Sequence, residues 1–538
     1  VPKLEAPVSH AGRPRLMTGA EALVRTLKQH GVTTVFGYPG AHTVPIYEAL
    51  RRERGVRHVL VRHEQGAAFM ADGYARSSGR VGVCLTTAGP GATNTATAVA
   101  EALSDCVPIV VLTAQVDTTA RGKGAYHELD LRDFFEPITK WNAAAERAEH
   151  IPLLVAEAFF HCRSGRPGPA QLELPRDVLA AECRPTFPEP RDIVRPPVSE
   201  EEANAIAQRL SAARRPALLA GGGVVSADAC AEFVALTETL KAPAATTQMG
   251  RGAIPDSHPL ALGQSNTSRV QHVFGQADLV LAVGCRFAEV STRGWSLPAP
   301  NLIHIDVDPR AFHPSYPAQM QVVADAKRAL AAIVETLRRR RTDVSSEWQP
   351  SEMVVAQTGS EWPHDAVIEC IQAAFNDATV FGLDVTILTY RLLTRRRVQR
   401  PRTMLYPAAY IAMGYGLPAA IGAKVAWPER PVACLAGDGG FAMTLQELAT
   451  AVRLGVPLPI LVYNDGCLQS IKRAHSAAYP GRSFEVELNN PDFVALARAF
   501  GGDGRRVADV SDLPAALEQA KASDGVFLVE VLAGAEQS

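Results

Sequence analysis

The fold is decided by the stretch Leu435-Ala436-Gly437-Asp438-Gly439-Gly440-Phe441, which continues the short apolar run 431–434. Such a run is typical of a buried parallel strand, and the glycines of this stretch let the backbone turn sharply and approach a ligand closely. A helix is expected next, because Thr444 and Glu447 have capping-box spacing and apolar residues recur at helical spacing up to Gly455. The sequence therefore predicts a strand, a tight turn and a helix.

A second polar group follows the next predicted strand, 458–463, where Asn464 stands 26 positions after Asp438. Two parallel strands joined by one crossover helix end at the same edge of a sheet. An Asp carboxylate, an Asn carbonyl and a backbone carbonyl near Gly466 suit Mg²⁺ and leave coordination positions for diphosphate oxygens. Gly-Asp-Gly alone is more often an ordinary strand-to-helix turn, but the spaced Asn favours a metal site formed by Asp438, Asn464 and Gly466.

This pattern resembles the thiamine-diphosphate motif, in which Gly-Asp-Gly is followed some two dozen residues later by Asn. The segment 412–424 is similar to the diphosphate-binding domain of the same enzymes. The resemblance implies that Met413, which by itself is typical of core packing, wedges between the two rings of the cofactor and enforces its bent conformation. It also implies that the cofactor contacts Gly437, Asp438, Gly439, Gly440, Asn464 and Gly466.

The first part of the chain alternates helix and strand, with helices expected over 20–30 and 44–54 and strands over 33–37 and 56–62. This alternation indicates a parallel α/β domain. Glu64 is expected to end the strand 59–63, and a helix, 65–76, follows it. This helix is rich in small residues, so we expect another element to pack closely against it. Taken alone, Glu64 is a carboxylate in the N-terminal turn of a helix, where its interaction with the helix dipole stabilises the helix by about 0.3–1 kcal/mol.

Three stretches, 35–40, 63–76 and 87–94, look like the pyrimidine-binding domain of the acetolactate synthase branch of these enzymes. In that family the acid after the strand hydrogen-bonds N1′ of the cofactor aminopyrimidine, so the resemblance assigns this role to Glu64. Sharing a proton with that nitrogen allows the 4′-amino group to remove the C2 proton of the thiazolium ring, whereas the electron sink belongs to the cofactor. Pro39, Gly40 and Asn94 are the further cofactor contacts that the resemblance implies.

Composition points to small-molecule substrates. The chain has 54 Lys and Arg against 56 Asp and Glu, so no excess of basic charge favours nucleic acid or an anionic membrane. The nine cysteines are scattered without a CxxC pair, which is typical of buried thiols in a reducing compartment. Neither a membrane span nor a signal-peptide apolar region is expected, and we predict a cytoplasmic protein.

A length of 538 residues exceeds what one core supports. We expect three doubly wound parallel α/β domains: a pyrimidine-binding domain over 16–183, a central Rossmann-like domain over 200–338 and a diphosphate- and Mg²⁺-binding domain over 360–535. An arm (1–15) and two linkers (184–199 and 340–358) complete the chain.

The central domain resembles one that often carries FAD in acetolactate synthases and thiamine-dependent oxidases. Its glycine-rich turns after predicted strands are equally typical of nucleotide binding and of plain helix–sheet packing. The family's flavin-contacting stretch is replaced here by 263–268. FAD therefore stays open.

The predicted cofactor residues lie in two different domains, which in this family come from different subunits. The resemblance therefore implies a homodimer or homotetramer with active sites at the subunit interface.

Several residues around the substrate depart from the acetolactate synthase pattern. The family's Arg-Phe-Asp-Asp-Arg is here 286–290, ending in Val290, which cannot make the charge-assisted contact of about 1.5–3 kcal/mol to the carboxylate of a second 2-oxo acid. Ala474 stands in for the Trp that shapes the acceptor pocket. Residues 383–389 stand in for the family's Asp-Val-Gly-Gln-His but lack its polar pair, and we have no physical account of that change. These departures predict an uncharged and wider acceptor pocket.

Two histidines fall on loops that match active-site loops. His127 replaces an active-site Gln, and His42 lies in a loop that resembles the one in benzaldehyde lyase whose His relays protons to a carbinol oxygen. A single His is more often structural or exposed, but both of these fall on matched active-site loops, and imidazole at neutral pH suits general acid–base catalysis. We predict His42 and His127, together with Glu64, as catalytic residues.

We therefore expect a thiamine-diphosphate- and Mg²⁺-dependent carboligase that joins an acyl unit from pyruvate or another small 2-oxo acid to an aldehyde, ketone or larger metabolite. Acetolactate synthase proper, acyloin lyase and 2-oxo acid decarboxylase stay open, as does a thiamine-binding homologue without turnover. The sequence leaves the donor, the acceptor, the stereochemistry, the choice between dimer and tetramer, and the pathway undetermined.

Overall fold

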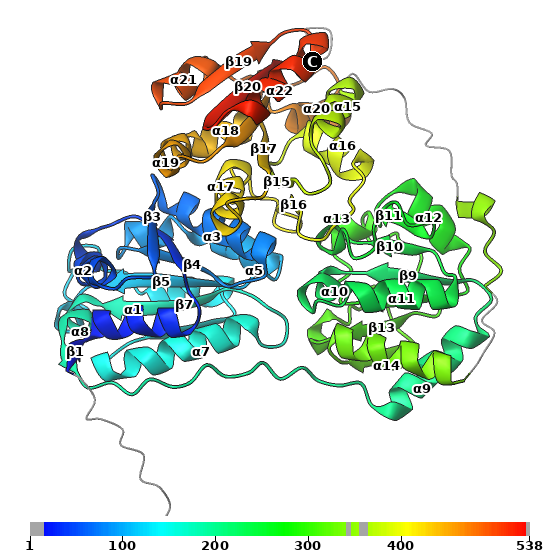
Figure 1. The fold of residues 1–538 in the computed structure, drawn as a ribbon, viewed down its shortest axis with the longest axis horizontal. Helices are drawn as coiled ribbons and strands as arrows, with labels where there is room; N and C mark the ends of the chain where they lie inside the picture. Colours follow the sequence, from blue (N-terminus) through cyan, green and yellow to red (C-terminus); the bar gives the residue numbers. More distant parts are fainter. Residues whose placement is uncertain (1–15, 341–345, 354–363, 534–538) are drawn as a thin grey trace, which may run out of the picture.

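The computed structural model describes residues 16–340, 346–353 and 364–533. It arranges them in three α/β domains, each built on a six-stranded parallel sheet (Figure 1). The predicted fold class is thereby confirmed. The predicted arm 1–15, part of the second linker, and the boundary positions 360 and 535 lie outside the described residues, and the domain boundaries stay predictions.

The first domain has the strand order β3-β2-β4-β5-β7-β6. A short antiparallel pair joins Met17 and Thr18 of β1 to Cys183 and Glu182 of β8, which connects the two ends of this domain. The strands are β1 (Met17–Thr18), β2 (Thr34–Gly37), β3 (Arg57–Leu60), β4 (Gly82–Thr86), β5 (Ile109–Gln115), β6 (Trp141–Ala144), β7 (Ala170–Pro175) and β8 (Glu182–Cys183). The helices are α1 (Gly19–Gln29), α2 (Val44–Arg52), α3 (Glu64–Ser78), α4 (Pro90–Thr93), α5 (Ala96–Ser104), α6 (Leu131–Phe135), α7 (Ile151–Arg163) and α8 (Arg176–Ala180).

The central domain has the order β11-β10-β9-β12-β13-β14. Numbered along the chain this is 3-2-1-4-5-6, the order of dinucleotide-binding sheets. The strands are β9 (Pro216–Ala220), β10 (Ala244–Thr246), β11 (Ala261–Gln264), β12 (Leu279–Val283), β13 (Ile303–Asp306) and β14 (Met320–Val323). The helices are α9 (Glu200–Ala212), α10 (Gly222–Ser226), α11 (Cys230–Leu240), α12 (Ser268–Gly275), α13 (Glu289–Thr292) and α14 (Ala326–Arg339).

The third domain has the order β16-β15-β17-β18-β20-β19, the same relative order as the first, as expected for two similar folds. The strands are β15 (Val380–Leu383), β16 (Met404–Leu405), β17 (Val432–Gly437), β18 (Leu458–Asn464), β19 (Asp503–Val507) and β20 (Val526–Leu532). The helices are α15 (Asp365–Ala374), α16 (Ile387–Arg395), α17 (Gly416–Ala426), α18 (Asp438–Thr444), α19 (Leu448–Leu454), α20 (Gln469–Ala478), α21 (Phe493–Ala499) and α22 (Leu513–Ala522).

The first and third domains pack through α3 and α17, and one hydrophobic core runs across both. A side chain at Gly73 would lie 2.3 Å from the Ala419 carbonyl oxygen, and one at Gly422 would lie 2.0 Å from the Met70 carbonyl oxygen. Only glycine permits this approach, because a Cβ atom at either position would overlap the facing backbone. The small residues of the predicted helix 65–76 are thus explained by the domain contact.

Two local predictions were wrong. Glu64 does not end a strand: it is the first residue of α3, after His63 as N-cap. Thr444 and Glu447 form no capping box, because the Thr444 hydroxyl donates to the Gly414 carbonyl and Glu447 accepts from the first domain. Tertiary contacts outcompete the local cap at this site.

All nine cysteines are free. Six are buried, whereas Cys106, Cys230 and Cys370 are partly exposed. No helix within the described ranges combines the length and the apolar character that a membrane crossing requires.

Candidate functional site

Asp438 and Asn464 lie at one sheet edge, as their spacing predicted. β17 and β18 are adjacent and parallel, with Gly437 opposite Tyr463. Asp438 begins α18 directly after β17, and Asn464 is the last residue of β18. The turn needs Gly440, because a side chain there would lie 2.4 Å from Asp384 Oδ1.

The side-chain oxygens of Asp438 and Asn464 converge on one amide group, that of Asn490. Its Nδ2 donates to Asp438 Oδ2 at 2.6 Å and to Asn464 Oδ1 at 2.9 Å. The Gly466 N–H donates to the same two oxygens at 2.9 and 3.2 Å. Two oxygen ligands from neighbouring strand ends are therefore held close enough to share one positively polarised partner, which fits the donor set that Mg²⁺ prefers.

Electrostatics at this edge also favour a cation. Burial raises the pKa of the Asp438 carboxyl, while hydrogen bonds from Gly439, Asn490 and Gly466 oppose that shift. Burial and the neighbouring Asp438 charge raise the pKa of Asp465 to about 6. A divalent cation between these groups would offset the repulsion of two partly buried carboxylates.

Met413 lies over the Gly-Asp-Gly turn. A side chain at Gly439 would come within 3.6 Å of Met413 Cε, so the thioether side chain reaches the backbone next to Asp438. The flanking residues Ile411 (φ 60°) and Gly414 (φ 80°) are left-handed. The structure thus brings Met413 to the edge that carries Asp438, as the resemblance implied.

Glu64 lies at the equivalent edge of the first domain and is 9% exposed. Its Oε2 accepts from Asn94 Nδ2 at 3.0 Å. Its Oε1 faces Gly91, where a side chain would lie 3.3 Å away, and has no hydrogen bond to any other described residue. One carboxylate oxygen is therefore held by the protein while the other is left for a ligand that carries a proton or accepts one.

The two predicted histidines lie together, and Thr87 and Gly91 connect them to the Glu64 carboxylate. The His42 and His127 rings are 5.7 Å apart between centroids, and Tyr126 stacks on His127 at 3.7 Å. His42 Nδ1 lies 3.5 Å from the Thr87 hydroxyl, and Thr87 also packs against Gly91. Burial, with the nearby His127 and Arg176, lowers the pKa of His42, so its imidazole is neutral at pH 7 and able to accept a proton. Pro39 and Gly40 precede His42 in the same loop, and the Gly40 N–H donates to Thr43 Oγ1.

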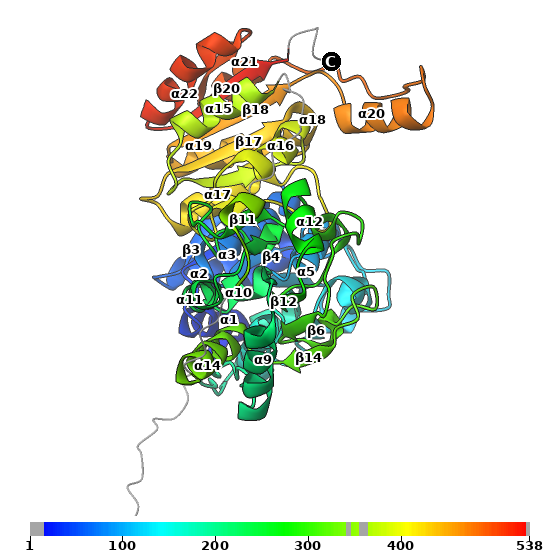
Figure 2. The same ribbon diagram turned by 90° about the vertical axis from the view of Figure 1, so that its right-hand side faces the viewer.

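Within one chain the Glu64 and Asp438 side chains share no hydrogen-bond partner among the described residues, and the contact that joins their surroundings is made by Glu447, which accepts from the backbone N–H groups of Arg62 and His63. Large apolar side chains near both edges are exposed, including Tyr126 (71%) and Phe484 (76%). α20, just beyond Asn464, has no buried residue and projects from the domain (Figure 2). Exposed apolar surface of this kind marks interaction sites.

A second hollow lies against the central sheet. It is a cavity of about 320 Å³ lined by residues of all three domains, among them Gly222, Gly284, Arg286 and Arg402. It opens where the strand order reverses, between β9 and β12, which is where dinucleotides bind to such sheets. Burial and the neighbouring Asp308 charge raise the pKa of Asp306, at the end of β13 on this cavity, to about 6.

The glycine-rich turns here serve close packing in the first place. A side chain at Gly221 would lie 1.9 Å from the Gly284 carbonyl oxygen, and one at Gly223 would lie 2.6 Å from Gly284 Cα. The stretch that replaces the family's flavin contacts places Gln264 on the cavity, beside Gln248. The amide of Gln248 and Oε1 of Gln264 are buried and have no hydrogen-bond partner among the described residues. The unpaired amides of Gln248 and Gln264 can thus bind a polar nucleotide, but Gln264 belongs to the stretch that replaces the family's flavin contacts.

Sequence reasoning missed two residues of the main site. Asn490 follows a loop far beyond Asn464, and nothing in its spacing pointed to the metal edge. Glu447 Oε1 accepts from the backbone N–H groups of Arg62 (3.1 Å) and His63 (2.9 Å), immediately before Glu64. The spacing from Thr444 predicted that the Glu447 side chain caps its own helix, so a contact with the first domain was not expected. No group of three His, Cys, Asp or Glu side chains within the described ranges is arranged for a metal, and the Asp438 edge depends on amide and backbone oxygens instead.

Three family models match the chain. They are described as the N-terminal TPP binding domain, the central domain and the C-terminal TPP binding domain of thiamine pyrophosphate enzymes, and they match residues 17–134, 203–333 and 385–531. Thiamine pyrophosphate is a synonym of thiamine diphosphate. The three matches fall on the three sheets in chain order.

Curated relatives match over nearly the whole chain. A protein named probable 2-ketoarginine decarboxylase from Pseudomonas aeruginosa is 39% identical, covering 96% of this chain and 94% of its own length. A probable acetolactate synthase large subunit from Methanocaldococcus jannaschii is 34% identical, covering 96% and 92%. The acetolactate synthase large subunit of Corynebacterium glutamicum is 35% identical, covering 98% and 89%.

Proposed function

This chain belongs to the thiamine pyrophosphate enzymes, which make or break a carbon–carbon bond next to a carbonyl, and on that premise we propose that it is a carboligase acting on a small 2-oxo acid donor and an aldehyde, ketone or larger acceptor. The observation that carries the proposal is the pairing of His42 and His127 beside Glu64, at the edge where the resemblance places the reacting carbonyl.

Glu64 is the residue that activates the cofactor in this proposal. Thiamine diphosphate, when bound, supplies the electron sink for the bond next to the carbonyl. Glu64 Oε1 holds a proton at N1′ of the aminopyrimidine, and Asn94 fixes the other carboxylate oxygen at 3.0 Å. Glu447 binds the backbone before Glu64 through the Arg62 and His63 N–H groups, so the carboxylate is presented from the N-terminus of α3.

Asp438, Asn464 and the Gly466 carbonyl hold Mg²⁺ in the same proposal, and Asn490 orients the first two as an outer-shell partner. Outer-shell partners of this kind set ligand orientation and metal affinity. Met413 and the glycines Gly437, Gly439 and Gly440 shape the surface against which the cofactor lies.

His42 is the proton-transfer group toward the acceptor oxygen. Its pKa is lowered by burial, so it is unprotonated at neutral pH and able to accept a proton. His127, 5.7 Å away between ring centroids, is the second such group. Two imidazoles side by side suit proton transfer at a carbinol oxygen better than they suit binding of a second carboxylate.

The acceptor is proposed to lack a carboxylate because Val290 and Ala474 supply no positive charge. Val290 is 40% exposed on α13, and Ala474 lies on the exposed helix α20. A 2-oxo acid decarboxylase is the second candidate, favoured by the relative named probable 2-ketoarginine decarboxylase. Such an enzyme would release an aldehyde without any acceptor.

The active form is proposed to be a homodimer or homotetramer in which Glu64 of one chain and Asp438 of another complete each site. The assembly is supported by two observations: the Glu64 and Asp438 side chains of one chain share no hydrogen-bond partner among the described residues, and Tyr126 and Phe484 expose apolar surface. A cytoplasmic location remains our expectation, supported by nine free thiols.

For the central cavity, the lining supports binding of the adenine-nucleotide part of FAD but gives no support for binding of its flavin ring. The strand order, the neighbouring Arg286 and Arg402, and the carboxyl group of Asp306 suit an adenine nucleotide, whereas Gln264 belongs to the stretch 263–268 that replaces the family's flavin contacts.

The experiment is turnover of pyruvate by the purified protein with thiamine diphosphate and Mg²⁺, with CO₂ and products followed by mass spectrometry, with and without a panel of aldehydes and ketones. A mixed acyloin formed only when an acceptor is present supports the carboligase. Acetolactate from pyruvate alone at a comparable rate would overturn the argument from Val290, and aldehyde release without an acceptor would indicate a decarboxylase.

A further inference from the structure

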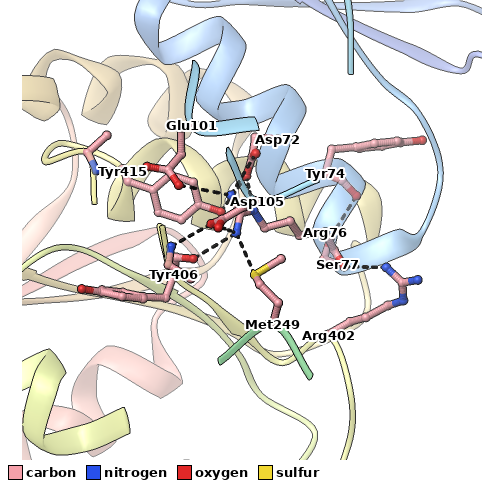
Figure 3. A network of polar contacts seen from close by, with 12 residues as sticks. Asp72, Tyr74, Arg76, Ser77, Glu101, Asp105, Met249, Arg402, Tyr406 and Tyr415 are labelled. Atoms are coloured by element: carbon pink, nitrogen blue, oxygen red, sulfur yellow. Dashed lines mark hydrogen bonds and ion pairs between the residues drawn. The ribbon is translucent and has the colours of Figure 1, made fainter. Parts of the chain in front are cut away.

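A buried cluster of charged side chains lies where the three domains meet (Figure 3). Its centre is the Arg76 guanidinium, which binds Asp72 (Nε to Oδ1, 2.6 Å) and Asp105 (Nη1 to Oδ2, 2.8 Å). Glu101 lies 3.9 Å from the same guanidinium. The central domain reaches the cluster through Met249, whose sulfur lies 3.3 Å from Arg76 Nη1.

The cluster holds three carboxyl groups for one guanidinium. Asp72 also accepts from the Tyr415 hydroxyl at 2.8 Å, but Glu101 Oε1 and Asp105 Oδ1 are buried and have no hydrogen-bond partner among the described residues. Ionised carboxylates only accept hydrogen bonds, so one proton between Glu101 and Asp105 would give both oxygens a partner. Burial and the adjacent Asp105 charge raise the pKa of Glu101 to about 9, which keeps that proton in place at neutral pH.

The cluster holds one particular segment of the third domain, residues 406–415, which has neither helix nor strand. Three backbone groups of this segment bind the first domain. The Tyr406 carbonyl accepts from Arg76 at 3.0 Å, the Ala408 N–H donates to Asp105 at 2.7 Å, and the Ala412 N–H donates to Glu101 Oε2 at 3.0 Å.

Among the three acids of the cluster, Glu101 is the one that binds the residue next to Met413, since its carboxyl group accepts from the Ala412 N–H. On the other side the Gly414 N–H donates to Asp384 at 3.1 Å, so Met413 is held between two buried acids of different domains. Ile411, with φ of 60°, adopts a conformation that a β-branched residue avoids and that persists only where the surroundings impose it. The backbone that presents Met413 therefore depends on contacts from outside its own domain.

We propose that Glu101 is a positioning residue for the cofactor: its carboxyl group shares one proton with Asp105 and holds Ala412, and through it Met413, in place. The inference rests on the role proposed for Met413. Glu101 acts only through the backbone of the 406–415 segment and does not touch the reacting atoms.

Matched variants separate this role from general packing. Glu101→Gln keeps an acceptor for Ala412 and a donor toward Asp105, whereas Glu101→Ala removes both and leaves a buried N–H unpaired. We expect the Gln variant to bind thiamine diphosphate within about twofold of wild type and the Ala variant to bind about tenfold more weakly, as the loss of one buried hydrogen bond implies. Calorimetric titration of each folded variant with the cofactor at saturating Mg²⁺ measures this.

The proton itself has a direct readout that does not require cofactor binding. A buried protonated carboxyl gives a C=O stretching band in the infrared spectrum, and we expect that band in wild type and its loss in Glu101→Gln. A band unchanged in the Gln variant, or an Ala variant that binds cofactor as tightly as wild type, would overturn the proposal. Met413→Ala with unchanged cofactor affinity would instead refute the role of Met413 and leave the shared proton standing.

Discussion

The division of the active site between two chains predicts complementation of two inactive variants. Glu64→Gln removes the acid at the aminopyrimidine, and Asp438→Asn removes the charged metal ligand. In a two-fold symmetric dimer that carries one copy of each variant, one site receives both defects and the other receives neither. The purified hybrid is therefore expected to show about half of the wild-type activity per dimer, because one of its two sites is intact.

The assay uses two affinity tags on co-expressed chains and tandem purification of the hybrid, followed by CO₂ release from the best donor. The matched control pairs wild type with a Glu64→Gln, Asp438→Asn double variant. That hybrid carries the same two substitutions, but each site now has one defect, so it is expected to be inactive. An inactive first hybrid with a half-active control would refute the reasoning and place Glu64 and Asp438 of one chain in the same site.

Three further perturbations test the contacts around this site. Asn490→Ala removes the amide between Asp438 and Asn464, and we expect calorimetry to show Mg²⁺ affinity lower by about 10–100-fold, the usual effect of losing an outer-shell partner; unchanged affinity would contradict that role. Burial raises the pKa of the Glu447 carboxyl from 4.5 to about 7, so its contribution to stability is fully present below about pH 4.5 and is lost as the pH rises through 7. Glu447→Gln cannot titrate, and its thermal midpoint should fall less than that of wild type from about pH 5 to about pH 8 in scanning fluorimetry; parallel profiles would be inconsistent with this account. His42→Ala should lower kcat of ligation about 100-fold, as the loss of a general base does, with cofactor affinity retained; an equal loss of cofactor affinity would mean that His42 is structural.

The sequence predicted those parts of the site that depend on neighbouring strands. Asp438 and Asn464 each end a short apolar run, and the crossover between them leaves one topology, so their meeting at one edge follows from periodicity and chain direction alone. The small residues of α3 likewise predicted that another element packs closely against this helix. That element is α17, and the close approach occurs at Gly73 and Gly422, each of which faces the backbone of the other helix. The resemblance added the roles of Glu64 and Met413, which periodicity does not contain.

The parts that could not be predicted depend on contacts across long stretches of chain. Glu447 has capping-box spacing, yet its carboxylate binds backbone N–H groups 384 and 385 positions earlier. Glu101 lies in α5, which is almost entirely apolar, and its partner Ala412 is 311 positions away, so the sequence does not indicate which group its carboxyl binds. Local pattern fixes an element and its face, whereas the partner of a buried polar group is decided only when the domains pack.

The central claim, that Glu64 activates thiamine diphosphate held at the Asp438 edge, is tested most directly by exchange of the C2 proton of the bound cofactor. The protein with cofactor and Mg²⁺ is diluted into D₂O, quenched in acid and read by proton NMR, for wild type and Glu64→Gln. We predict that the variant still binds cofactor but exchanges this proton at least about 100-fold more slowly, the scale of losing a positioned acid–base group. Equal exchange rates in the two proteins would contradict the account.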